Sequence, residues 1–182
     1  MIDSAILDRR IDAARISPDG LDSEIAANAE ERAAIVGAYD LVAVDALSAN
    51  VTLTHGPRGS VEVSGRVLAD IVQSCVVTLE PVAQHIDEPI AVRFVPADSP
   101  DAPGPAKPGK EVVVDADAPD PPEVMEGTSV NLGALVEEIF VLAIDPYPRA
   151  PGAELPAEAA EPPESAADSP FAMLRDVGKG KA

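Results

Sequence analysis

Two runs of alternating hydrophobic and polar residues, 51–54 and 60–64, flank a loop in the middle of the chain. The loop contains His55, Gly56, Pro57, Arg58 and Gly59, and glycine and proline between two alternating runs are typical of a β-hairpin. The second run continues through Gly65 to residue 72, where the glycine indicates a bulge or a bend. Residues 75–79 are predicted to extend or restart the sheet, Glu80 and Pro81 to end it, and the alternating run 86–95 to form a further strand. The region therefore predicts an antiparallel meander.

Shorter patterns on either side of this meander predict two more strands and two helices. Looser alternation over 6–16, a Ser-Pro-Asp-Gly turn at 17–20 and alternation over 21–26 predict a strand, a turn and a second strand. Asn28 followed by Glu31 has the spacing of a capping box and predicts a short helix to about residue 38. A longer helix over 131–144, capped by Asn131, is predicted because apolar residues recur at three- and four-residue spacing, at Leu132, Leu135, Val136, Ile139, Leu142 and Ala143.

Together these elements predict one α+β domain over residues 1–148. Its curved antiparallel sheet contains the N-terminal strands, the hairpin and the 86–95 strand, and the long and the short helix pack on it. Both an open sheet and one that closes toward a barrel are compatible with this pattern. Residues 97–126 are rich in proline and acidic residues and predict a mobile loop, in which only 111–115 has a strand-like pattern. Residues 149–169 predict a disordered linker, and 170–182 a short docking segment with apolar residues at 170–174.

Composition narrows the classes of partner and compartment. The chain has 182 residues with 13 Lys and Arg against 32 Asp and Glu, a net charge of −19, which excludes general coating of nucleic acid and argues against DNA as a partner. Residues 1–96 and 127–148 alone contain 18 carboxylates against seven arginines, a balance of −11. This acidity favours a basic partner or serves only solubility. A single cysteine, charged residues at 3, 8 and 9, and apolar runs too short to span a bilayer predict a soluble cytoplasmic protein.

Few residues offer chemistry. His55 and His85 are interpreted as solvated loop histidines, with a metal or small-ligand site as the less favoured alternative. Cys75 lies among Val and Ile residues and is interpreted as a buried small hydrophobe rather than a reactive thiolate. Glu137 and Glu138 are adjacent on the long helix, about 100 degrees apart, so a solvated helix edge is favoured over an acid–base pair. We therefore predict no enzyme activity, no cofactor and no metal.

Several blocks of the sequence resemble the large ribosomal RNA subunit accumulation proteins, the YceD-like family. The first two are 67–81 (Val-Leu-Ala-Asp-Ile-Val-Gln-Ser-Cys-Val-Val-Thr-Leu-Glu-Pro) and 87–96 (Asp-Glu-Pro-Ile-Ala-Val-Arg-Phe-Val-Pro). After an acidic spacer come 130–138 (Val-Asn-Leu-Gly-Ala-Leu-Val-Glu-Glu), 142–148 (Leu-Ala-Ile-Asp-Pro-Tyr-Pro) and 169–174 (Ser-Pro-Phe-Ala-Met-Leu). Their joint order and spacing carry the resemblance, which covers most of residues 5–175. Many members have a Cys-x-x-Cys at the first block and some a further cysteine after the proline-rich exit of the long helix. This chain keeps only Cys75, has Thr78 at the second position and has no cysteine after Pro148.

The resemblance implies a bacterial factor needed for accumulation of 23S ribosomal RNA, and thus for large-subunit biogenesis. We expect it to bind a basic ribosomal protein or an assembly intermediate, with rRNA contacted indirectly. The residues expected to bind this partner are Glu137, Glu138, Tyr147, Phe171 and Leu174. The alternative is direct RNA binding through an arginine patch formed by Arg9, Arg10, Arg15, Arg58, Arg66 and Arg93.

Overall fold

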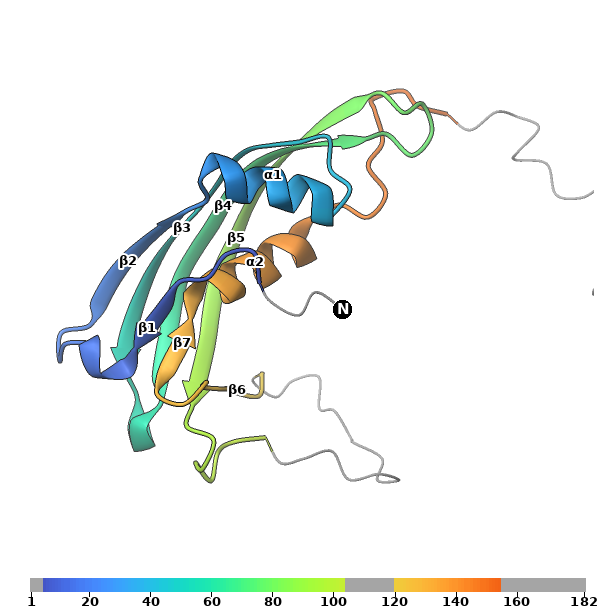
Figure 1. The fold of residues 1–182 in the computed structure, drawn as a ribbon. Coiled ribbons are helices and arrows are strands. Elements are labelled where there is room, and N and C mark those ends of the chain that lie inside the picture. The colour runs from blue at the N-terminus through green and yellow to red at the C-terminus, as the bar shows by residue number, and fades with distance from the viewer. Residues whose placement is uncertain (1–4, 104–119, 155–182) are drawn as a thin grey trace, which may run out of the picture.

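The computed structural model describes residues 5–103 and 120–154 (Figure 1). In chain order its elements are β1 (Arg10–Asp12), the 3-10 helix η1 (Ala13–Arg15), β2 (Leu21–Ala26), α1 (Ala29–Ala38), β3 (Ala43–His55), the 3-10 helix η2 (Pro57–Gly59), β4 (Val61–Ser74), β5 (Pro81–Val95), β6 (Glu123–Val124), β7 (Ser129–Asn131) and α2 (Leu132–Ala143). The prediction of a mixed α+β fold with one shorter and one longer helix is confirmed.

The main sheet has five strands in the order β2-β3-β4-β5-β6. Strands β2 to β5 form the expected antiparallel meander, and β6 adds to β5 in parallel. The sheet is open, with β2 and β6 at its two edges among the described residues, so closure into a barrel is not confirmed. Strand β1 pairs with β7 in a separate two-stranded ribbon. The prediction that all N-terminal strands join the main sheet was therefore wrong for β1, which is held at the start of α2 by the bond from the Leu132 N–H to the Arg9 carbonyl.

The predicted hairpin is confirmed as β3 and β4, which stay paired from His55 and Val61 at the turn to Ala43 and Val72. Gly65 is not at a bulge, because the β3–β4 register runs through it without a shift, and the irregularity lies between Val44 and Ala46. A Cβ atom at Gly65 would lie 2.1 Å from the carbonyl oxygen of Asn50. Glycine at this position therefore allows the two backbones to approach closely.

Residues 75–80 form a turn, so the predicted strand over 75–79 was wrong. The Cys75 N–H donates to the Glu80 carbonyl at 2.8 Å, the Leu79 N–H donates to the Cys75 carbonyl at 3.0 Å, and Leu79 has a positive φ of 62°. These bonds reverse the chain, and β5 then begins at Pro81 and extends well before the predicted start at residue 86. Proline is tolerated there because the first residue of a strand need not donate to the ladder.

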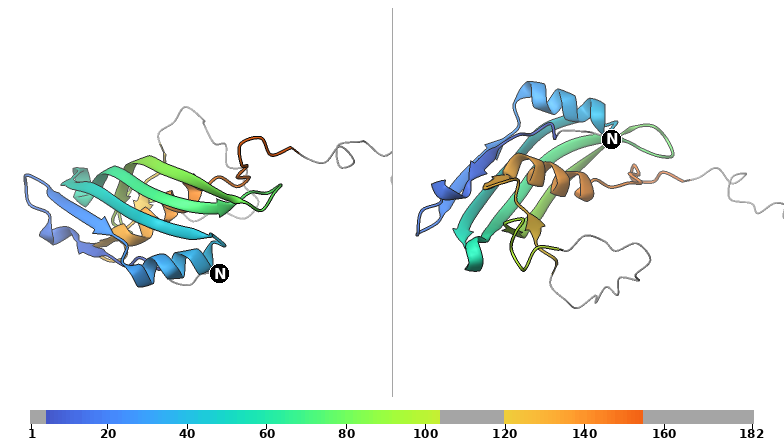
Figure 2. Two further views of the ribbon diagram at one scale, coloured as in Figure 1. Left: turned by 90° about the horizontal axis from the view of Figure 1, so that it is seen from above. Right: turned by 60° about the horizontal axis from the view of Figure 1, so that its bottom comes forward.

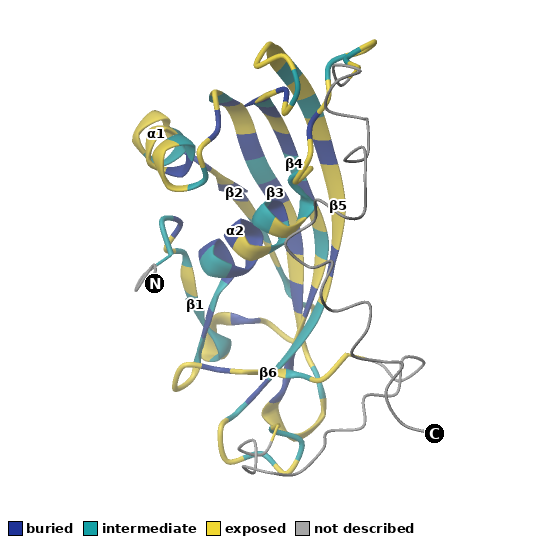
Figure 3. Ribbon diagram, turned by 90° about the vertical axis from the view of Figure 1, so that its right-hand side faces the viewer, coloured by how far each residue is buried: buried dark blue, intermediate teal, exposed yellow. Residues whose placement is uncertain are grey.

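Both helices pack on one face of the sheet (Figures 1 and 2). Alternate residues of β4 are buried on that face, among them Val61, Val63, Val67 and Ile71, while the residues between them are mostly exposed on the other (Figure 3). The buried side chains of α2, including Leu132, Val136 and Phe140, join this core. The core is almost entirely aliphatic, as the low aromatic content requires, and the molecule has two layers.

Within the range 97–126, predicted to be a mobile loop, the structure describes 97–103 and 120–126. Strand β6 lies there, the Met125 side chain is buried, and Glu126 forms an ion pair with Arg10. The ordered fold therefore includes residues 123–126. The predicted strand at 111–115, most of the predicted linker and the docking segment 170–182 lie outside the described residues.

Candidate functional site

A hollow of the described surface lies between α2 and the outer edge of β5, and we call it the α2–β5 groove. Its cavity has a volume of about 720 Å³. Leu135, Ile139 and Leu142 of α2 form an apolar wall, and residues 91–93 of β5 form the opposite wall. Leu142 is 79% exposed although it belongs to the apolar stripe predicted to cover the sheet. The α2 helix therefore turns part of its apolar surface toward an open groove.

Two smaller hollows continue the groove along α2. One of about 130 Å³ shares Leu135 and Glu138 with it and reaches Phe94 and Glu126. The other, of about 230 Å³, shares Ile139 and Leu142 and reaches Glu88. The combined surface follows the exposed side of α2 from its first turn to its last, a length that suits an elongated ligand better than a compact one.

Acidic side chains surround this apolar surface. Glu88, Asp120, Glu123 and Glu138 line its hollows, whereas Arg93 is the cation among the described lining residues. The ion pairs formed between described residues involve other carboxylates, so these four are not neutralised by a neighbouring cation in an ion pair. Clustered like charges beside a low-dielectric wall strengthen the local field. The groove is thus suited to ligands that combine apolar and positively charged groups.

The two adjacent glutamates of α2 have different environments. Glu138 is exposed and lines the groove, as expected for a partner-binding residue. Glu137 is only 4% exposed, so its interpretation as part of a solvated helix edge was wrong. Its Oε2 accepts a hydrogen bond from the Leu7 N–H at 2.9 Å, and its Oε1 accepts one from the Tyr39 hydroxyl at 2.7 Å. Glu137 therefore joins α2 to the N-terminal segment and to the end of α1, and it does not face a partner.

The contact between Glu137 and Tyr39 also changes the acidity of the phenol. Burial, together with the hydrogen bond and the charge of Glu137, raises the pKa of Tyr39 to about 12. Deprotonation would place a second negative charge beside the carboxylate in a partly buried position, which is unfavourable. Nothing near Glu137 in the sequence signals this contact, because Tyr39 and Leu7 are 98 and 130 residues away.

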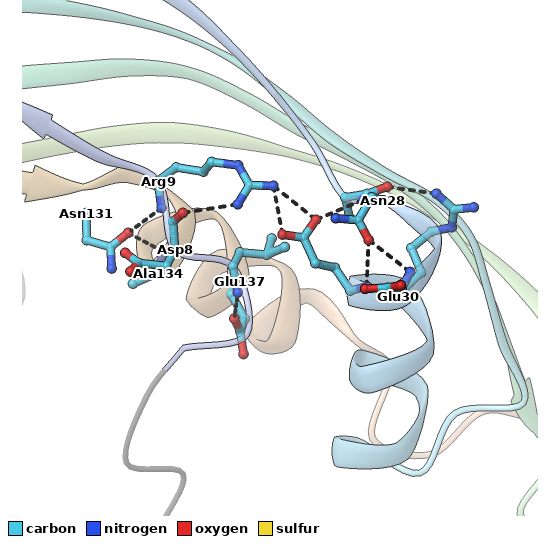
Figure 4. A network of polar contacts seen from close by, with 11 residues as sticks. Asp8, Arg9, Asn28, Glu30, Asn131, Ala134 and Glu137 are labelled. Carbon is cyan, nitrogen blue, oxygen red and sulfur yellow. Dashed lines mark hydrogen bonds and ion pairs between the residues drawn. The ribbon is translucent and has the colours of Figure 1, made fainter.

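A polar network fixes the N-terminal segment on α2 next to Glu137 (Figure 4). The Asn131 side-chain oxygen caps α2 by accepting from the Ala134 N–H and also accepts from the Arg9 N–H. The Arg9 guanidinium forms an ion pair with Glu31 at 2.7 Å, and Glu31 also completes the predicted capping box with Asn28. The caps predicted for both helices are confirmed, and they connect the two helix starts.

The turn at 75–80, here called the Cys75 loop, contacts the segment that follows α2. The Val76 N–H donates to the Pro148 carbonyl at 2.9 Å, and the Gln73 side chain donates to the Asp145 carbonyl. Two of the sequence blocks that carry the family resemblance therefore meet at one end of the molecule. Tyr147 is 72% exposed there, and the Cys75 loop also exposes Val76 and Leu79. Tyr147 is therefore accessible, but it is not among the residues that line the α2–β5 groove. Phe171 and Leu174 lie outside the described residues.

Cys75 is buried, as predicted, but its surroundings are polar. Its sulfur accepts from the backbone N–H groups of Ala150 at 3.3 Å and of Val77 and Thr78 at 3.4 Å. These bonds, with Ala150 the largest contribution, lower the pKa of the thiol to about 6. Sequence reasoning missed this because Ala150 lies 75 residues away. Thr78, which stands at the second cysteine position of the family pattern, indeed lies beside the sulfur.

The arginines proposed as an RNA-binding patch lie on different elements and mostly contact carboxylates. Arg9 pairs with Glu31, Arg10 with Asp8 and Glu126, Arg58 with Asp101, and Arg66 with Asp87. Arg93 lines the acidic groove, and Arg15 is exposed on η1. Such surface pairs are weak, with a median of about 0–1 kcal/mol, but they reduce the positive potential that a phosphate backbone would meet.

The two histidines do not come together. His55 contacts the Ile16 carbonyl at 3.1 Å, and exposed His85 contacts Asp70 at 2.7 Å. In the described part of the chain, no three His, Cys, Asp or Glu side chains gather where they could share a metal ion. Likewise, none of its helices is both long enough and apolar enough to cross a membrane.

Comparison with known proteins identifies the family. The chain matched no curated protein and no solved structure. A family model described as large ribosomal RNA subunit accumulation protein YceD matches residues 63–177. This range contains all of β4 except its first two residues, β5 to β7, α2 and the whole α2–β5 groove, whereas β1 to β3 and α1, which the resemblance also covered, lie outside it. Because the match spans more than half of the 182 residues, the chain belongs to the YceD family of large ribosomal RNA subunit accumulation proteins.

Proposed function

We propose that this protein is a non-enzymatic factor in biogenesis of the large ribosomal subunit and supports 23S rRNA accumulation by binding a basic ribosomal protein in the α2–β5 groove. The observation that carries the proposal is a set of four carboxylates, Glu88, Asp120, Glu123 and Glu138, which line hollows beside the apolar wall of α2 and form no ion pair with a described residue. The family assignment supports the ribosomal context. Binding alone accounts for the proposed role, so no cofactor is required.

The charge of the whole molecule supports a basic partner. The chain contains 32 Asp and Glu against 13 Lys and Arg, a net charge of −19. Such a surface attracts a basic protein over long distances and raises the association rate, and the effect decreases as salt screens it over a Debye length of about 10 Å at 0.1 M. The same surface repels free RNA, which makes indirect contact with rRNA the better-supported route.

The C-terminal segment Pro170–Leu174 supplies a second contact in this proposal. It carries Phe171 and Leu174 after a spacer rich in Ala, Pro and Glu. A tethered apolar segment meets a partner held in the groove at an effective concentration in about the millimolar range, so a weak individual contact adds to the overall affinity.

Affinity purification of the full chain at low and high salt, with identification of bound protein and RNA, tests the proposal. We expect a basic large-subunit protein at low salt, reduced at high salt and lost in the double variant Glu123→Lys, Glu138→Lys. The matched control is Glu24→Lys, Glu62→Lys, which changes the charge equally on the exposed face of the sheet away from the helices. Retention of rRNA without any ribosomal protein would refute the proposal and favour the arginine patch.

A further inference from the structure

Among the described strands, none pairs with the outer edge of β5 where it borders the α2–β5 groove. Among the described residues, β6 pairs only with Phe94 and Val95, although β5 begins at Pro81. The Val95 carbonyl accepts the Met125 N–H from this side. Alternate residues of a strand direct their backbone groups to the same edge, so the backbone of Ala91 and Arg93 faces the groove.

Prolines define the length of this free edge. Pro121 and Pro122 precede β6 and have no N–H to donate, which explains why β6 begins only at Glu123, opposite Phe94. At the other end, Pro89 pairs with Arg66 of β4 without disrupting the register. Its missing N–H is tolerated because position 89 shares the outward orientation of 91 and 93. The open stretch is therefore about four residues, or roughly 13 Å, long.

The surroundings of this stretch favour a particular kind of occupant. A strand added here would direct alternate side chains toward the apolar wall formed by Leu135, Ile139 and Leu142. Its remaining side chains would lie near the rim, where Glu88, Asp120, Glu123 and Glu138 are located. An extended segment with alternating apolar and basic residues is complementary to both surfaces.

We propose that the basic partner binds by strand addition: a short extended segment, alternating apolar with Lys or Arg residues, pairs with the backbone of Ala91 and Arg93. This inference rests on the proposed function and specifies how the same groove recognises its partner. Backbone pairing provides affinity that does not depend on exact sequence, while the apolar wall and the carboxylate rim select the alternating pattern.

The probe is a set of overlapping peptides that cover the proteins of the large subunit. The affinity of the tightest-binding peptide for the full chain is then measured in solution. Ala91→Pro removes an N–H that β4 does not use, whereas Ala91→Val changes the exposed side chain and keeps the N–H. We expect Ala91→Pro to weaken peptide binding about tenfold and Ala91→Val to change it less than about twofold. In the unmodified chain, bound peptide should slow hydrogen exchange of the Ala91 and Arg93 amides.

The outcomes separate this inference from the proposed function. If Glu123→Lys, Glu138→Lys abolishes peptide binding while Ala91→Pro binds normally and the two amides stay unprotected, strand addition is wrong and the acidic groove remains the partner site. If no large-subunit peptide binds, or if only rRNA fragments bind, both fail. Protection of the two amides supports the inference even where Ala91→Pro folds poorly, because that measurement needs no substitution.

Discussion

Replacing Glu137 by alanine removes the acceptor of two hydrogen bonds that join three parts of the chain. The carboxylate on α2 accepts from the Leu7 N–H at 2.9 Å and from the Tyr39 hydroxyl at 2.7 Å. Leu7 is fully buried, so its N–H would have no water to replace the lost acceptor. The partly buried Tyr39 hydroxyl can turn toward solvent and loses less.

The expected cost follows from these two bonds. A hydrogen bond to a charged group contributes about 1.5–3 kcal/mol, and a buried donor without a partner costs about 1–3 kcal/mol. We therefore expect Glu137→Ala to lower the free energy of unfolding by about 3–5 kcal/mol, a large share of the roughly 5–15 kcal/mol typical of a domain. Glu137→Gln keeps the shape but can accept from only one of the two donors, and about 1–2 kcal/mol is expected.

Urea unfolding followed by circular dichroism measures these differences. Glu138→Ala is the matched control, because it alters the neighbouring exposed glutamate on the same helix. In a Tyr147→Phe background, which leaves Tyr39 as the one tyrosine, phenolate absorbance should show the pKa of Tyr39 falling from about 12 toward 10 in Glu137→Gln. A Glu137→Ala protein as stable as the control would refute this account of Glu137.

Three further predictions, with four substitutions, test other parts of the fold. Gly133→Ala should destabilise the protein, because a Cβ atom there would lie 2.3 Å from the Leu7 carbonyl oxygen. Gly37→Ala in α1 has open space around it and should stabilise the protein by up to about 1 kcal/mol. Equal unfolding midpoints of the two variants would contradict this. The pKa of Cys75, about 6, lies below that of a thiol in the unfolded chain, so the folded protein loses the thiol proton first as the pH rises. The free energy of unfolding should therefore increase from pH 6 to pH 9, and by less in Cys75→Ala. Parallel pH profiles of the two proteins would argue against a stabilised thiolate. Leu79→Asn should leave stability unchanged or raise it by up to about 1 kcal/mol. Leu79 has a φ of 62°, which asparagine adopts more readily than leucine, and its side chain is 77% exposed. A clearly lower midpoint of thermal unfolding would show that the leucine side chain packs in solution.

The local pattern of the sequence predicted most of the elements. The β3–β4 hairpin and both helix caps follow from interactions between residues close in sequence, and all three are confirmed. The sequence could not predict that β1 pairs with β7, because that choice depends on Arg9 and Leu132 meeting across more than 120 residues. The interpretation of Glu137 was wrong for the same reason. Its partners Leu7 and Tyr39 are distant in sequence, and without them an acidic residue on a helix is expected to be solvated.

The candidate site was predictable only in part. Glu138 and the acidic balance pointed to a basic partner, but the groove also depends on β6, which begins only after Pro121 and Pro122 and pairs with Phe94 and Val95 of β5. Neither proline carries a functional signal in the sequence alone. The polar environment of Cys75 was equally hidden, because its strongest donor is the backbone of Ala150, whose side chain is irrelevant to the bond.

Sedimentation of ribosomal particles from cells whose only copy is the groove variant Glu123→Lys, Glu138→Lys tests the central claim most directly. The variant should be folded and present at normal levels, yet large subunits should be deficient relative to small subunits. Cells with the control variant Glu24→Lys, Glu62→Lys should have a normal profile. The claim that the α2–β5 groove binds the partner would be contradicted if cells with the groove variant had a normal profile while cells that lack the protein still had fewer large subunits.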